Sequence, residues 1–131
     1  MSLEIETRGC LRLWNMVICT AINDSIRPFS LVFYTGENYK KSFARQYKIL
    51  LKRQENPFIF HWRDVGGEPV SLNQRRARTW FESYGEDFIN VCHYAGIEDP
   101  ASLSKRVMEM CALADEYKEK YKIDKSKKET P

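Results

Sequence analysis

The stretch from Phe88 to Val107, FINVCHYAGIEDPASLSKRV, carries the strongest structural signals in the chain. Its first part predicts a helix over 86–95. That helix ends at Gly96, because glycine adopts the left-handed conformation of a helix C-cap. Asp99 followed by Pro100 is typical of a new helix start, with an aspartate as N-cap and a proline at the first helical position. The stretch therefore predicts two helices joined by a tight turn.

The apolar pattern around this turn fits a helix-turn-helix unit spanning about 86–117. In such a unit two helices cross steeply, so the first needs small residues, the turn needs a glycine, and an apolar residue follows the turn. The residues that meet these needs are Val91, Cys92, Ala95, Gly96, Ile97, Leu103 and Val107. An ordinary helical hairpin uses the same turn chemistry and is an open alternative.

A helix-turn-helix unit reads DNA with the first residues of its second helix, which enters the major groove. Here the projecting residues would be Ala101, Ser102, Lys105 and Arg106. Ser102 and Lys105 are suited to bases or phosphates, and Arg106 is suited to a phosphate or a guanine edge. The acidic residues just before this helix repel phosphates, which favours the plain hairpin.

Three more helices are expected outward from this stretch. The first, over 3–26, has an apolar stripe broad enough to predict a central, buried helix. The second spans 37–54. The third ends near 83 and opens with Ser71 and Gln74, whose spacing is that of a capping box.

The fold class that follows is mainly α, a single-domain bundle of about five helices over 1–120. The last residues, 121–131, are dominated by charge and predict a flexible tail. Two short aromatic runs, 29–34 and 58–62, predict either a short β-hairpin or irregular segments whose side chains pack into the core. Their periodicity does not separate these alternatives.

The net charge is only +3, but the charges are segregated along the chain. Residues 38–54 contain six cations and no acid, whereas 82–99 contain acids and no Lys or Arg. This segregation predicts one basic face that attracts polyanions, and solvated helix faces are the equally weighted alternative. The cations expected to contact a phosphate backbone are Lys40, Lys41, Arg75, Arg76 and Arg78.

Cysteine and histidine usage points away from a metal site. Four cysteines lie far apart and only two histidines are present, so free thiols in a reducing cytosol are the simpler interpretation. No stretch has the signal-peptide pattern or the length to span a bilayer, and we expect a cytoplasmic protein. Neither His61 nor His93 has a ligand or triad partner at useful spacing. We expect no cofactor and no enzymatic activity.

The helix-turn-helix stretch resembles that of lactose-repressor-type regulators, most closely over 91–97 and 101–107. It departs from that pattern by one extra residue in the turn and by Arg106 at an apolar position. Short motifs elsewhere, such as Leu13-Trp14 and Ala77-Arg-Thr-Trp80, resemble small proteins encoded by bacteriophages and prophages. That resemblance implies a phage context, in which small DNA-binding regulators and DNA-recognising packaging subunits occur.

The sequence thus predicts a phage-type protein that binds double-stranded DNA, as a small regulator or packaging-related factor. Basic helices would capture the duplex, and the helix at 100–117 would then insert. Because helix-turn-helix proteins often act as dimers, we expect a homodimer, for which the last helix offers a surface. The alternative is a non-enzymatic adaptor that binds a host or phage protein through exposed aromatic residues.

Overall fold

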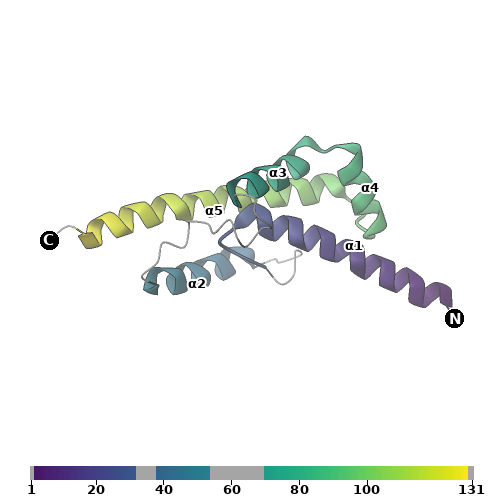
Figure 1. Cartoon of the computed structure of the whole chain (residues 1–131), viewed down its shortest axis with the longest axis horizontal. Coiled ribbons are helices and arrows are strands. Elements are labelled where there is room, and N and C mark those ends of the chain that lie inside the picture. Colours follow the sequence, from purple (N-terminus) through teal and green to yellow (C-terminus); the bar gives the residue numbers. More distant parts are fainter. Residues whose placement is uncertain (1, 32–37, 54–69, 130–131) are drawn as a thin grey trace.

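The computed structural model describes residues 2–31, 38–53 and 70–129 of the chain. These residues form five α-helices and no strand, which confirms the mainly α fold class. The helices, shown in Figure 1, are α1 (Ser2–Ile26), α2 (Tyr39–Lys52), α3 (Val70–Ser83), α4 (Glu86–Tyr94) and α5 (Pro100–Glu129). Within the described ranges, no helix combines the length and the apolarity that crossing a membrane requires.

Two long helices, α1 and α5, organise the fold and extend from it in opposite directions (Figure 1). Residues Ile18, Ile22 and Ile26 of α1 are almost fully buried, as are Val107 and Met110 of α5. Helices α3 and α4 close this core with a cluster of edge-to-face rings, whose members are Trp80, Phe81 and Phe88. The core thus joins the first helix of the chain to the last three.

Helices α3 and α5 run antiparallel, because contacts from successive turns of α3 fall on successively earlier turns of α5. Lys118 donates to Gln74 at 3.3 Å, and Arg78 donates to Asp115 at 2.9 Å. At the other end, the Ser104 hydroxyl donates to the carbonyl of Phe81 at 2.7 Å. This register places the start of α3 beside the middle of α5.

Helix α2 packs on the C-terminal half of α5 through a second aromatic cluster. Phe43 stacks on Phe29 with ring centroids 4.5 Å apart, and Tyr47 lies 4.8 Å from Tyr117. The hydroxyl of Tyr47 donates to Asp124 at 2.9 Å, which fixes α2 to the far part of α5. The buried residues of α2 all lie on this one side.

Helix α5 continues beyond the end of the predicted domain at residue 120. It runs to Glu129, and Tyr121 within the predicted tail is only 6% exposed. In the tail, Asp124 accepts the hydrogen bond from Tyr47 of α2, whereas Ile123 is 57% exposed, so the charge-rich composition gave no sign that Tyr121 is buried. The predicted hairpin is not seen where the structure describes it: Phe29 is buried outside any strand. Residues 32–34 and 58–62 lie outside the described residues.

Two local expectations differ from the structure. Helix α3 begins at Val70, so Ser71 lies inside the helix and is not its N-cap. The side-chain amide of Gln74 donates across the fold to the carbonyls of Ser25 and Arg27. Helix α1 is not buried all round either, because three large apolar side chains face away from the described helices. Their exposed fractions are 59% for Leu13, 60% for Met16 and 40% for Val17.

Candidate nucleic-acid interface

The turn between α4 and α5 has the geometry that its sequence predicts. Gly96 adopts a φ of +77°, its amide donates to His93 at 3.1 Å, and the amide of Ile97 donates to Cys92 at 2.9 Å. These two bonds are the Schellman pair that satisfies the last carbonyls of a helix. A Cβ on Gly96 would lie 3.3 Å from the side chain of Leu11. The turn is therefore closed from within and packed against α1.

Helix α1 also holds this turn by a side chain that sequence reasoning did not single out. The Asn15 amide donates to the carbonyl of Ala95 at 3.1 Å and to Leu11 of its own helix at 2.7 Å. Beside it, the rings of Trp14 and Tyr94 lie 5.2 Å apart. An asparagine on the edge of an apolar stripe is the only sequence signal for this contact. The α4–α5 joint is therefore fixed by long-range as well as local bonds.

The start of α5 is capped as predicted. Asp99 accepts a hydrogen bond from the amide of Ser102 at 3.1 Å, and Pro100 is the first residue of the helix. The Asp99 carboxylate is thus used at the helix N-terminus, where it satisfies a free backbone amide and offsets the helix dipole. It faces the backbone of α5 while remaining at the surface.

Helix α4 lies across the axis of α5 in Figure 1, and apolar side chains of both helices belong to one hydrophobic core cluster. Val91 and Cys92 of α4 are buried, as are Leu103 and Val107 of α5. The other side of α5 faces outward: Ser102, Lys105 and Arg106 are all exposed. The first two turns of α5 therefore present polar and cationic groups from a rigid support.

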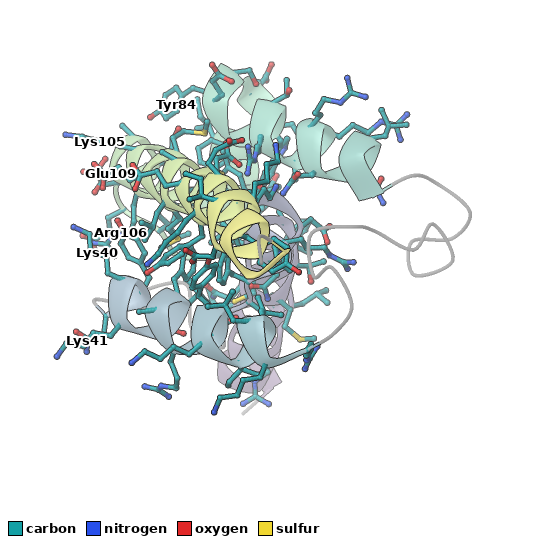
Figure 2. The ribbon with its side chains drawn as sticks, turned by 90° about the vertical axis from the view of Figure 1, so that its left-hand side faces the viewer. Lys40, Lys41, Tyr84, Lys105, Arg106 and Glu109 are labelled. Carbon is teal, nitrogen blue, oxygen red and sulfur yellow. The ribbon has the colours of Figure 1, made fainter. Side chains whose placement is uncertain are left out.

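The exposed start of α5 and the start of α2 share one side of the molecule. Figure 2 shows Lys105 and Arg106 on the same side as Lys40 and Lys41. Glu109 projects there too, one turn after Lys105. The acid lowers the positive potential at this point, and sequence reasoning did not include it. Among the residues labelled there, cations outnumber the one acid, and the exposed acids Glu98 and Asp99 just before α5 lower the positive potential further.

The α3 arginines do not join this group. Arg75 and Arg76 are exposed, but they follow the N-terminal end of α3, which lies on the opposite side in Figure 2. The antiparallel register agrees, because the neighbouring Gln74 meets Lys118, about three and a half turns beyond Lys105 on α5. The predicted phosphate contacts thus fall into two separate sets.

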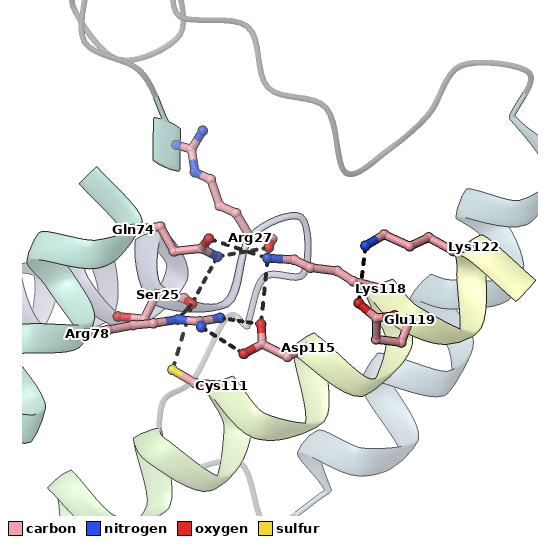
Figure 3. Close-up of polar contacts among 9 residues, drawn as sticks. All are labelled: Ser25, Arg27, Gln74, Arg78, Cys111, Asp115, Lys118, Glu119 and Lys122. Carbon is pink, nitrogen blue, oxygen red and sulfur yellow. Dashed lines mark hydrogen bonds and ion pairs between the residues drawn. The ribbon is translucent and has the colours of Figure 1, made fainter. Parts of the chain in front are cut away.

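Arg78 is held inside the molecule, as Figure 3 shows. Its guanidinium donates two hydrogen bonds to Asp115 and one to the carbonyl of Ser25, each at 2.9 Å. Burial opposes the charge of Arg78, but the pairing with Asp115 leaves its pKa raised. Burial lowers the pKa of the neighbouring Lys118. Arg78 thus joins α1, α3 and α5, and its partner lies too far along the chain for a local pattern to reveal it.

The described residues hold no cluster that could bind a metal ion, and their two buried thiols are poorly reactive. No three His, Cys, Asp or Glu side chains gather within those ranges in a way that could hold a metal ion. Burial raises the pKa of the Cys111 thiol to about 11 and also raises that of Cys92. Thiols of this kind are poor nucleophiles at neutral pH, because the thiolate is the reactive form.

Comparison of the sequence with models of known protein families gives no match, and comparisons with curated proteins and with solved structures give none either.

Proposed function

We propose that this protein binds double-stranded DNA, with α4 and α5 acting as a helix-turn-helix unit. The observation that carries the proposal is the rigid presentation of Ser102, Lys105 and Arg106 on the exposed first turns of α5. In this arrangement the start of α5 enters the major groove, where these side chains reach base edges and flanking phosphates. The proposal includes a phage-type regulatory or packaging role in the cytoplasm.

Lys40 and Lys41 extend the same interface. They lie on the side of the molecule that presents the start of α5 (Figure 2) and are exposed. Contacts from lysines to the backbone position a protein on the duplex without reading its sequence. The proposed interface therefore combines a reading element on α5 with positioning contacts from α2, and it leaves out the three α3 arginines.

A salt titration of binding to random duplex DNA tests the proposal. Each neutralised phosphate contributes about 0.9 to the slope of log affinity against log salt. Four cations predict a slope of about −3 to −4, so affinity falls on the order of 100-fold between about 50 and 200 mM salt. Absence of salt-dependent binding by the wild-type chain contradicts the proposal.

The role of α5 is tested by the double variant Lys105→Gln/Arg106→Gln. We expect its slope to be shallower by about 2. The matched control is Arg75→Gln/Lys122→Gln, which makes the same charge change at two exposed positions, one on the opposite side of the molecule and one about four to five turns further along α5. Equal slopes for the variant and its control contradict the assignment to α5. Selection from a random duplex library, with Ser102→Ala beside the double variant, then measures base reading.

The exposed apolar face of α1 favours a second candidate function, protein binding. Met16 and Val17 follow Leu13 by three and four residues, so both lie beside it on one face of the helix. Exposed apolar patches often mark protein contacts, and a second copy of the chain is one such partner. Light scattering of the wild type and of Leu13→Gln/Val17→Gln tests this: a dimer that dissociates in the variant supports the homodimer. An adaptor predicts no salt-dependent DNA binding.

A further inference from the structure

The outer face of α2 carries a line of four cations. Lys41, Arg45, Lys48 and Lys52 follow each other at steps of four, three and four residues, which places them on one face of a helix. All four are exposed, whereas Phe43, Tyr47 and Leu50 on the other face are buried. We call these four residues the α2 stripe.

The α2 stripe contributes nothing visible to the fold. No ion pair among the described residues involves any of its members, and residues 38–53 contain no acid. Like charges four residues apart repel and cost about 0.2–0.5 kcal/mol per pair. Some cations elsewhere in the described ranges are paired, as Lys122 is with Glu119 at 3.2 Å. Within the described residues, the stripe therefore presents positive charge without an ion-pair partner, available to an external partner.

The stripe has a fixed orientation, because its helix is anchored on both sides. Tyr47 donates to Asp124 of α5. Gln46 accepts from the amide of Ser30 at 3.0 Å and donates to its carbonyl at 2.8 Å. A partner that binds such a preorganised surface avoids the cost of ordering the helix.

The geometry points to the α2 stripe as a second, sequence-independent contact to the phosphate backbone of duplex DNA. Eleven residues of helix span about 16 Å, a length over which a duplex carries about ten phosphates. Lys41, the first member, lies on the side that presents Lys105 and Arg106 (Figure 2), so the stripe leads away from the proposed interface. The inference rests on the proposed DNA binding and adds to it a contact that tracks the backbone.

The test is the triple variant Arg45→Gln/Lys48→Gln/Lys52→Gln, which keeps Lys40 and Lys41. Binding to random duplex DNA is measured by fluorescence anisotropy across the same salt range. We expect the slope to become shallower by about 2–3, with affinity lowered equally on unrelated sequences. The matched control, Arg12→Gln/Arg75→Gln/Lys122→Gln, removes three exposed charges on α1, α3 and α5. Circular dichroism verifies folding, and because repulsion is removed the stripe variant is expected to melt no lower than the wild type.

Failure of the inference and failure of the proposed function give different results. If the stripe variant and the control share one slope while Lys105→Gln/Arg106→Gln weakens binding, the inference is overturned and the function stands. If the slope of log affinity against log salt becomes shallower in the stripe variant but not in Lys105→Gln/Arg106→Gln, the contact by the stripe stands and the role of α5 is overturned. If the wild-type chain does not bind the duplex at low salt, both the inference and the proposed function are overturned. This holds also if the chain binds vesicles of anionic lipid but not the duplex.

Discussion

Replacing Arg78 is expected to destabilise the fold without changing DNA binding. The guanidinium makes three charge-assisted hydrogen bonds, two to Asp115 and one to Ser25, and its side chain is only 20% exposed. Bonds to charged groups contribute about 1.5–3 kcal/mol each, and the 51% exposure of Asp115 reduces this through solvent screening. The Ser25 carbonyl keeps Gln74 as a donor. We therefore expect Arg78→Gln to lower the free energy of unfolding by about 2–3 kcal/mol.

Thermal and urea unfolding followed by circular dichroism measure this loss. For a chain of this length a change of 1 kcal/mol moves the melting temperature by about 3–5 °C, so the expected fall is roughly 6–15 °C. Asp115→Asn is expected to cost less, about 1–2 kcal/mol, because the bond from Arg78 to Ser25 survives. A double-mutant cycle of the two changes should give a coupling of about 1 kcal/mol. A coupling below about 0.3 kcal/mol, or a shallower salt slope of DNA binding in Arg78→Gln, would refute the internal role.

Four further predictions concern the α4–α5 turn and the thiols. Gly96→Ala should lower the melting temperature by roughly 3–8 °C, because a non-glycine residue at this φ costs about 1–2 kcal/mol and its Cβ meets Leu11 at 3.3 Å. Asp99→Ala should cost about 1 kcal/mol in urea unfolding through loss of the N-cap bond. In alkylation at pH 8 followed by mass spectrometry, Cys10 should react in the folded chain while Cys111 should not, because Cys111 is buried with a pKa of about 11. The unfolded chain releases that thiol proton near pH 9 and the folded chain only near 11, so stability should fall as pH rises across this window.

Local signals in the sequence were sufficient for the turn but not for the contacts between helices. Gly96, Asp99 and Pro100 act within a few residues of themselves, and the structure confirms each assignment. The capping box at Ser71 and Gln74 failed because α3 begins at Val70, before Ser71, and because the side-chain oxygen of Gln74 accepts from Lys118 of α5, forty-four residues later in the chain. A short sequence pattern indicates which hydrogen bonds a residue can make with its near neighbours in the chain. It does not indicate which partners distant in the sequence will compete for the same side chain.

The apolar stripe of α1 shows a related limit. Its breadth predicts a central, buried helix, yet Leu13, Met16 and Val17 face away from the described helices. Hydrophobic periodicity identifies which residues avoid water but not which partner covers them. A second chain is as compatible with the pattern as a core. The sequence alone therefore predicted the helix and the buried face that contains Ile18 and Ile22. It did not predict whether the opposite face is covered.

The arrangement of charge has the largest consequence for function. The positions of the cations along the sequence suggest that α2, α3 and α5 form one basic face. In the structure these cations do not share one face, because some point to opposite sides of the molecule and one is held in an ion pair. Arg78 is held by Asp115, and the N-terminal end of α3 lies opposite the side shared by α2 and the start of α5 (Figure 2). A straight duplex contacts one side of a small protein at a time, so only charges on that side contribute together to counterion release. Binding to a straight duplex should therefore depend on α2 and α5 jointly and be insensitive to Arg75, whereas equal dependence on all three helices requires a bent duplex or a second chain.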